Sequence, residues 1–438
     1  MMNILIIKNL FANVYGVAVN LVFQILLVPL YINCWGKSLY SDWIVITSLT
    51  AFFSITNIGL STVTQNVYSI EYINNNIKKC NSLLVNNIFL VSLVFICSLI
   101  VSIIVLSIID LPKFLHLSEM NRSLANFIFV SFLIYIYTSM YGTILDSLFR
   151  AQSKYHIATF ISNTSRLIEV LIIIFCVSCN VSIYLMVSLY LFPGLFFLFY
   201  KYKLAKDFIQ FSINKKYYDW SLFKQLLIPS VSFLSIPVSY SVLIQGSNLI
   251  VNYFFGPNAV VLYTTTRTLS NFITTILKTI KHAIWPEFTV AFAHGDSKEM
   301  NKLYKISVIL SIFFAILASL VLLFGGDWIY SIWLHGSVMF DASLMFSFVL
   351  IIIVHSLWES GSVVLESTNN HIVLGLLFVC LSILTQLLAY VVLTKYKFID
   401  VLPYSQLIME IIVLSYVVGK INKVIYGKKT NNCSNYEN

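Results

Sequence analysis

Charged side chains are scarce in this sequence: only 10% of its 438 residues are Asp, Glu, Lys or Arg, while 59% are hydrophobic. A soluble globular domain has about 25% charged residues. The scarcity of charge therefore excludes a soluble protein and indicates an integral membrane protein. Long outer loops are also lacking, since the largest predicted ones cover only residues 110–123 and 325–341. They leave no room for a folded external domain that performs chemistry.

Cysteine is the next scarce residue, with seven copies scattered along the chain. The CxxC spacing of Cys176-Val-Ser-Cys179 has no second cysteine pair and no nearby His. Small apolar packing residues in a helix explain these positions better than a metal or redox site. We therefore predict no metal site, no cofactor and no catalytic residue.

Long hydrophobic runs are what the sequence has instead. An α-helix needs about 20 mostly apolar residues to cross a bilayer. Twelve such runs predict an all-α polytopic membrane protein with 12 transmembrane helices. The first run follows Lys8 and lacks a small-residue cleavage site, so we expect a span rather than a signal peptide. The predicted spans are 10–32, 43–66, 83–109, 124–148, 157–179, 181–200, 226–251, 259–283, 303–324, 342–365, 371–393 and 401–419.

The two halves of the sequence resemble each other at a shift of 220 residues. Gly36 matches Gly256 at this shift. The motif Leu145-Asp146-Ser147 likewise matches Leu365-Glu366-Ser367. Six spans per half give both halves the same direction across the membrane, so we predict two parallel six-helix bundles of the kind found in alternating-access transporters. The predicted division is 1–206 for the first bundle, 207–220 for a cytoplasmic linker, and 221–438 for the second bundle with a basic cytoplasmic tail.

The placement of the basic residues between the predicted spans explains the net charge of +9. If the N-terminus is cytoplasmic, few of the 27 Lys and Arg residues fall on outer segments. This asymmetry is the positive-inside rule, which places both termini in the cytoplasm and makes nucleic-acid binding unnecessary as an explanation. The outer basic residues are Lys37, Lys113, Arg122, Lys395 and Lys397.

Polar residues form stripes at helical spacing on the first, second, seventh and eighth spans. Polar side chains in a span are costly unless they face protein or water. We predict that the stripes line a hydrated central cavity, although polar residues that join neighbouring helices are the simpler explanation for any one position. The stripe residues selected as substrate-binding candidates are Asn20, Gln24, Thr47, Asn57, Gln245 and Asn271.

Two arginines lie near the middle of predicted spans, where each needs a partner or water. Arg166 has Glu169 three residues away, which predicts an ion pair on one helix face. Arg267 lies in the polar stripe of the eighth span, and its repeat mate is Thr47. A guanidinium can hold a phosphate or carboxylate with two parallel hydrogen bonds. Arg267 is therefore the leading substrate-binding candidate, followed by Arg166.

Three titratable residues in the spans are candidates for coupling transport to a proton or Na⁺. Glu169 lies on the fifth span, and His355 and Glu359 share a face of the tenth. For the last two, an internal hydrogen bond is an equally good explanation. Asp146 and Glu366 lie at cytoplasmic helix ends, where we expect pairing with Arg150 or exposure to solvent.

Several segments resemble the Wzx-type polysaccharide flippases of the multidrug/oligosaccharidyl-lipid/polysaccharide exporter (MOP) superfamily, which have a MATE-like fold. The segments that carry the resemblance are Gly36-Lys-Ser-Leu-Tyr-Ser-Asp-Trp43, Asn57-Ile-Gly-Leu60, Trp285-Pro-Glu-Phe288 and Ala293-His-Gly-Asp296. The likeness extends over nearly the whole chain in span number, length and loop pattern.

The resemblance implies a transporter rather than an enzyme. It would move an undecaprenyl-pyrophosphate-linked oligosaccharide, such as an O-antigen repeat unit for lipopolysaccharide, to the outer leaflet of the bacterial inner membrane. It also implies association with polysaccharide polymerase and chain-length machinery. A multidrug or cation antiporter of the same superfamily is the alternative, with Glu169 or Glu359 as its membrane acid. A membrane-embedded polysaccharide polymerase is a weaker alternative, because the sequence lacks a sizeable outer loop.

Overall fold

The computed structural model describes residues 2–222, 224, 235, 237–294, 296–367 and 372–426. Within these ranges the chain is helical and contains no strand. Contacts divide the chain into two compact units, Met1–Val261 and Leu262–Asn438. The predicted two bundles joined at 207–220 stay a prediction.

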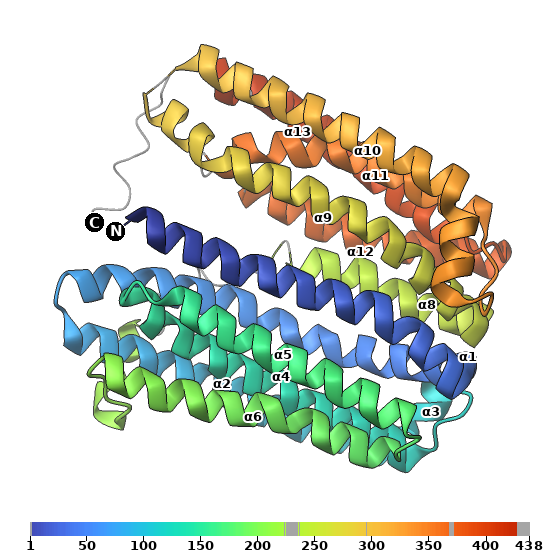
Figure 1. The fold of residues 1–438 in the computed structure, drawn as a ribbon, viewed down its shortest axis with the longest axis horizontal. Helices are drawn as coiled ribbons and strands as arrows, with labels where there is room; N and C mark the ends of the chain where they lie inside the picture. The colour runs from blue at the N-terminus through green and yellow to red at the C-terminus, as the bar shows by residue number, and fades with distance from the viewer. Residues whose placement is uncertain are drawn as a thin grey trace. The chain divides into compact units, whose positions relative to one another are not determined.

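The first unit is built on the long element α1, which consists of two helices that meet at a kink at Gly36 (Figure 1). Helix α1 contacts α2, α4 and α5, and α6 packs against α4 and α5. The apolar core of the first unit lies where α2 and α4 meet. It includes the buried residues Leu83, Leu84, Leu133 and Tyr137. The elements of this unit are α1 (Met2–Ile73), α2 (Ile77–Ile108), α3 (Leu111–Phe114), α4 (Arg122–Ala151), α5 (Tyr155–Ser178), α6 (Ile183–Phe208), η1 (Lys215–Tyr217), η2 (Val242–Gly246) and α8 (Ser247–Phe255).

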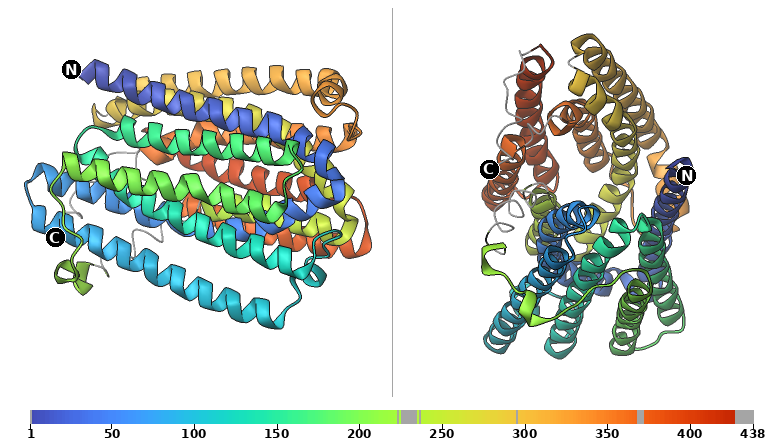
Figure 2. Two further views of the ribbon diagram at one scale, coloured as in Figure 1. Left: turned by 60° about the horizontal axis from the view of Figure 1, so that its bottom comes forward. Right: turned by 90° about the vertical axis from the view of Figure 1, so that its left-hand side faces the viewer.

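The second unit is organised around α11 and α13. Helix α11 packs against α10 and α13, and α12 packs against α13. The helices of each unit are seen in two further orientations in Figure 2. The elements are α9 (Pro257–His294), whose residues from 262 onward belong to this unit, α10 (Ser297–Leu334), α11 (Ala342–Ser367), α12 (Ile372–Lys395) and α13 (Val401–Tyr426).

The predicted spans coincide with helices wherever the structure describes them. Nine helices in the described ranges are long and apolar enough to cross a membrane. One of these, Phe11–Ser54, covers parts of the first and second predicted spans. Helix α9 matches the eighth predicted span but is not among the nine, because Thr, Asn, Arg and Lys interrupt its apolar sequence. The seventh predicted span lies largely outside the described residues. The all-α, multi-pass membrane architecture is confirmed.

The 220-residue repeat is visible in the helix starts. Asn76 accepts a backbone hydrogen bond at the start of α2, and Asp296 does the same at the start of α10. Asn121 caps α4, which begins 220 residues before α11. These coincidences support an internal duplication of the helix layout.

Gly36 and Gly256 have almost the same backbone conformation. Gly36 interrupts α1 with φ 77° and ψ 170°, and Gly256 precedes α9 with φ 76° and ψ −172°. This conformation is essentially restricted to glycine, because a Cβ atom clashes with the neighbouring backbone. The two halves of the chain therefore turn from one helix into the next in the same way.

Replacing Gly36 or Gly256 with Ala is expected to lower the free energy of unfolding by about 1–3 kcal/mol, through backbone strain alone. Beyond the adjacent residues of the chain, a Cβ at either position meets no atom within 4 Å. A clash with packed neighbours therefore does not contribute. Thermal unfolding in detergent measures the effect. Gly325, inside helix α10 and equally open, is the matched control, and Gly325→Ala should be neutral or slightly stabilising. Equal behaviour of all three variants would contradict the strain argument.

Candidate functional site

Arg166 is the centre of a polar cluster inside the first unit. Its Nη1 donates to Tyr190 Oη at 2.9 Å and to Glu169 Oε2 at 3.3 Å. Glu169 is buried and also accepts from Tyr135 Oη at 2.8 Å. The Arg166 Cζ atom lies 4.1 Å from the ring centroid of Phe23. The predicted Arg166–Glu169 ion pair is confirmed.

A cavity of about 180 Å³ adjoins this cluster, between α4, α5 and α6. At 1.5 Å rise per residue, the lining residues extend over about two turns of each helix. Glu169 lies toward one end of the cavity and the buried Lys201 toward the other. The lining residues are Tyr135, Thr138, Ser139, Gly142, Thr143, Ser162, Ser165, Arg166, Glu169, Gly194, Phe197, Leu198 and Lys201.

Lys201 forms an ion pair at the end of this cavity away from Glu169. Its Nζ donates to Asp146 Oδ1 and to Ser162 Oγ, both at 2.7 Å. The expectation that Asp146 pairs with Arg150 or faces solvent is therefore wrong. Sequence spacing favoured Arg150, one turn away, whereas α6 brings Lys201 in from 55 residues further along the chain.

Arg267 lies on α9 in the second unit and is partly buried. Its Cζ atom is 5.3 Å from the ring centroid of Tyr263, one turn earlier on the same helix. Such a cation–π contact holds the guanidinium against the helix surface. Its repeat mate Thr47 is also partly buried and donates to the backbone oxygen of Trp43 at 2.7 Å. The two matching positions therefore differ in charge, as the sequence indicates.

The remaining stripe candidates occupy different environments. Asn20 and Gln24 are exposed on α1, whereas Gln245 and Asn271 are partly buried. Gln245 lies in η2, a stretch of π-helix, a local irregularity that is frequent at functional sites. The side chain of Asn57 is outside what the structure describes. That these side chains line one common cavity stays a prediction.

Two polar residues of the seventh span join α8 to the rest of the first unit. Asn248 Nδ2 donates to Ser48 Oγ at 2.8 Å. Asn252 Nδ2 donates to the backbone oxygen of Leu115 at 2.6 Å. Both side chains are buried. At these two positions the polar residues connect neighbouring helices, which is the simpler of the two explanations given for the stripes.

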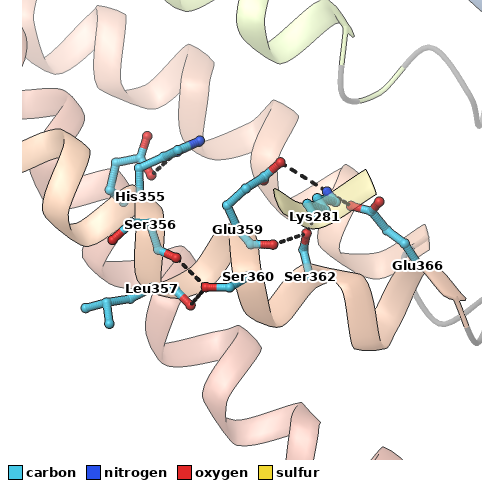
Figure 3. Close-up of polar contacts among 9 residues, drawn as sticks. Lys281, His355, Ser356, Leu357, Glu359, Ser360, Ser362 and Glu366 are labelled. Atoms are coloured by element: carbon cyan, nitrogen blue, oxygen red, sulfur yellow. Dashed lines mark hydrogen bonds and ion pairs between the residues drawn. The ribbon is translucent and has the colours of Figure 1, made fainter. Parts of the chain in front are cut away.

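The second unit contains a buried ion-pair network around Lys281 of α9 (Figure 3). Lys281 Nζ lies 2.7 Å from Glu366 Oε1 and 3.1 Å from Glu359 Oε1, both on α11. It also donates to Ser362 Oγ at 2.8 Å. Glu366 was expected to be exposed or paired like Asp146, but α9 supplies its partner from 85 residues earlier. Lys281 thus ties α9 to α11.

His355 and Glu359 do not bind each other and have separate partners. His355 Nδ1 lies 3.2 Å from Glu410 Oε2 of α13, and Trp358 Nε1 donates to the same carboxylate. All three residues are buried. Together with the Lys281 contacts, this places the buried carboxylates of Glu359 and Glu410 and the partly buried one of Glu366 near one lysine and one histidine. The predicted role of His355 and Glu359 in ion coupling stays a prediction.

Asp42 is a buried anchor residue that the sequence analysis did not single out as a candidate. Its carboxylate accepts hydrogen bonds from the backbone N–H groups of Ser118, Glu119 and Met120, at 2.7 to 3.1 Å. Charge-assisted bonds of this kind are strong. Asp42 therefore fixes the loop between α3 and α4 to α1. Its position in the Gly36–Trp43 motif was the one available signal.

Replacing Asp42 with Ala is expected to lower the free energy of unfolding by at least about 3 kcal/mol, since it leaves three backbone donors without their acceptor. Thermal unfolding in detergent measures the loss. Asp110→Ala is the control, because Asp110 is at the same end of the unit but pairs only with the exposed Lys113. Its loss should cost under about 1 kcal/mol. A similar loss in both variants would show that Asp42 is not an anchor.

Within the described ranges, no group of three or more His, Cys, Asp or Glu side chains is placed to hold a metal ion. The chemistry available is that of ion pairs and hydrogen bonds inside two helical units. These features define a polytopic helical membrane protein with charged groups buried among its helices.

Comparison with solved structures shows that the chain has a MATE-like fold. The inward-facing conformation of a multidrug resistance MATE family transporter matches with a TM-score of 0.76 and 10% identity, over 93% of this chain and 96% of that one. An outward-facing multidrug resistance MATE transporter gives 0.63 at 10% identity, over 97% of both chains. No family model and no curated protein sequence matches the chain.

A third similar structure is a MOP superfamily transporter from Pyrococcus furiosus, with a TM-score of 0.65, 11% identity and 96% coverage of both chains. That protein is described as having a binding pocket of reversed polarity, which suggests a different function. At these identities the comparisons establish the fold. The similar proteins are transporters, and none of the three is an enzyme.

Proposed function

We propose that this protein is an alternating-access transporter that moves an undecaprenyl-pyrophosphate-linked oligosaccharide, such as an O-antigen repeat unit, from the cytoplasmic to the outer leaflet of the bacterial inner membrane. The fold supports the transport mode, because solved proteins of this fold adopt both inward- and outward-facing conformations. The repeated helix layout also supports it, because internal repeats of this kind are typical of alternating-access transporters.

Arg267 is the observation that carries the choice of substrate. It lies in the polar stripe of α9, within the eighth predicted span, where a guanidinium suits a diphosphate better than a cationic drug. We assign the diphosphate contact to Arg267. Arg166 has a supporting role, since Glu169 and two tyrosine hydroxyls already engage its guanidinium. Asn20, Gln24, Thr47, Asn57, Gln245 and Asn271 are assigned to the sugar headgroup.

Coupling to a proton or Na⁺ is assigned to Glu169, His355 and Glu359. Each is buried and lies in a network whose charge balance changes when a cation binds. Substitution of any one by a neutral isostere is expected to uncouple transport from an imposed ion gradient, while substrate binding persists. Association with polysaccharide polymerase and chain-length machinery belongs to the same proposal.

A multidrug or cation antiporter is the second candidate. It is favoured by the multidrug transporters among the similar structures and by the buried carboxylate of Glu169 beside a cavity. The two candidates differ in their need for Arg267. A cation carrier is expected to work as well or better without that positive charge.

Surface polysaccharide assembly in cells that depend on this protein tests the choice. Arg267→Ala should abolish assembly while the protein still inserts and folds, because the diphosphate loses its counter-charge. Arg122→Ala is the matched control and should leave assembly intact. Arg122 is also basic, but its guanidinium donates a hydrogen bond to the backbone at the end of α2. Normal assembly with Arg267→Ala would overturn the assignment. Drug resistance conferred by that variant would favour the antiporter.

A further inference from the structure

The segment 209–222, which follows α6, is a folded strap held on the first unit. Asn81 Oδ1 accepts from the backbone N–H of Ser212 at 3.0 Å, and Asn86 Oδ1 accepts from that of Asp219 at 3.2 Å. Ser82 donates to the backbone oxygen of Tyr217 at 2.6 Å. These three side chains all come from the start of α2. The strap, defined as residues 209–222, therefore keeps one conformation and one face outward.

The strap lies at the level where α2 changes from polar to apolar. Exposed apolar residues follow one face of α2 at helical spacing, and their side chains are 43–54% exposed. The first of them, Phe89, contacts the Tyr218 ring at 4.8 Å between centroids. Exposed apolar residues on a membrane helix face lipid. The strap therefore sits at the boundary between headgroups and acyl chains. The α2 face consists of Phe89, Leu93, Ile96 and Ile100.

The outer face of the strap combines lysines with exposed aromatic and apolar side chains. Trp220 is 54% exposed, and Lys224 Nζ lies 5.4 Å from its ring centroid. Lys215 and Lys216 are exposed, with Lys216 Nζ 5.1 Å from the ring centroid of Tyr217. Trp and Tyr rings prefer the membrane interface. The cation–π contacts place the ammonium groups at the same level as these rings.

This surface has an excess of positive charge. Residues 209–224 contain three lysines and one acid, Asp219, giving a net charge of +2. Hydrogen bonds from Ser221 and Leu222 lower the pKa of Asp219, so its carboxylate is engaged as a helix cap. The exposed Lys78 of α2 lies one turn before Asn81 and Ser82, which hold the strap. Basic clusters next to the cytoplasmic ends of spans attract anionic headgroups.

We propose that this surface binds anionic phospholipid headgroups of the cytoplasmic leaflet. The ligand class follows from fixed lysines beside interfacial aromatic rings at the depth of the headgroups. The strap holds the first unit to the inner leaflet through these lipids. This proposal does not depend on the identity of the transported substrate.

Hydrogen–deuterium exchange of the full chain in vesicles tests the proposal. Backbone amides of residues 213–221 should exchange at least about tenfold more slowly in vesicles containing phosphatidylglycerol than in pure phosphatidylcholine. Substituting Lys215, Lys216 and Lys224 together by Gln should abolish the difference. Substituting Lys298, Lys302 and Lys305 of α10 removes the same charge elsewhere and should preserve it. These three lysines lie on the helix that repeats α2.

Three results would overturn the proposal. The first is equal exchange of the strap in both kinds of vesicle. The second is loss of the difference in the α10 control, which would indicate a general charge effect. The third is protection by inorganic pyrophosphate in pure phosphatidylcholine that equals or exceeds the protection by phosphatidylglycerol. That result would identify the surface as a site for a diphosphate rather than for the leaflet. None of these results depends on the transport activity.

Discussion

Replacing Lys281 with Met is expected to lower the free energy of unfolding by about 3–5 kcal/mol, one of the largest stability losses in the molecule. The substitution keeps most of the side-chain volume but leaves Glu359 and Glu366, which are 93% and 88% shielded from solvent, without the ammonium group that contacts both of them. Two uncompensated carboxylates in a low-dielectric interior are costly. Unfolding in mixed detergent micelles measures the loss.

A triple variant separates the charge effect from packing. Lys281→Met combined with Glu359→Gln and Glu366→Gln removes the unpaired charges and should recover most of the lost stability, because a neutral network of the same shape is often as stable as the ion pair. Lys302→Met breaks the exposed pair with Glu299 and should cost under about 1 kcal/mol. If the triple variant is no more stable than Lys281→Met alone, packing explains the loss and the network does not.

Replacing Arg267 with Ala is expected to weaken the binding of a polyprenyl diphosphate about 100-fold. Two charge-assisted hydrogen bonds are worth roughly 3 kcal/mol, and 1.4 kcal/mol corresponds to a factor of ten. Arg267→Lys keeps the charge but loses the paired donors, so a loss of about tenfold is expected. Titration of the purified protein with a fluorescent polyprenyl diphosphate measures both affinities.

The ranking of the variants by their affinity for the diphosphate tests this prediction. Wild type should bind best, followed by Arg267→Lys and then Arg267→Ala, with Arg122→Ala equal to wild type. A polyprenyl alcohol, which lacks the diphosphate, should bind all variants equally weakly. If Arg267→Ala binds the diphosphate as tightly as wild type, the guanidinium does not contact it.

The fold could be predicted because the length of an apolar run and its repeat are local properties of the sequence. The start of α4 at Arg122 and of α11 at Ala342 lie close to the predicted spans 124–148 and 342–365. The ion pair of Arg166 with Glu169 was predictable for the same reason, since three residues along a helix fix their proximity.

The partners of Lys281, Lys201 and Asp42 could not be predicted from spacing. Each finds its partner 55 to 85 residues away in the sequence, through helix packing that a single sequence does not specify. The repeat predicted that Gly36 and Gly256 correspond, but their shared left-handed geometry needed coordinates. The polar stripes were compatible with two roles, lining a cavity and joining neighbouring helices. The structure shows that Asn248 and Asn252 join helices.

Transport by the purified protein in vesicles tests the central claim most directly. Vesicles carrying a labelled undecaprenyl-pyrophosphate-linked oligosaccharide in one leaflet are assayed for its appearance in the other, with wild type and Arg267→Ala side by side. The account predicts rapid transfer by wild type, strong reduction by Arg267→Ala, and no comparable transport of a cationic drug. Transfer of the drug but not of the lipid-linked sugar by wild type would contradict it.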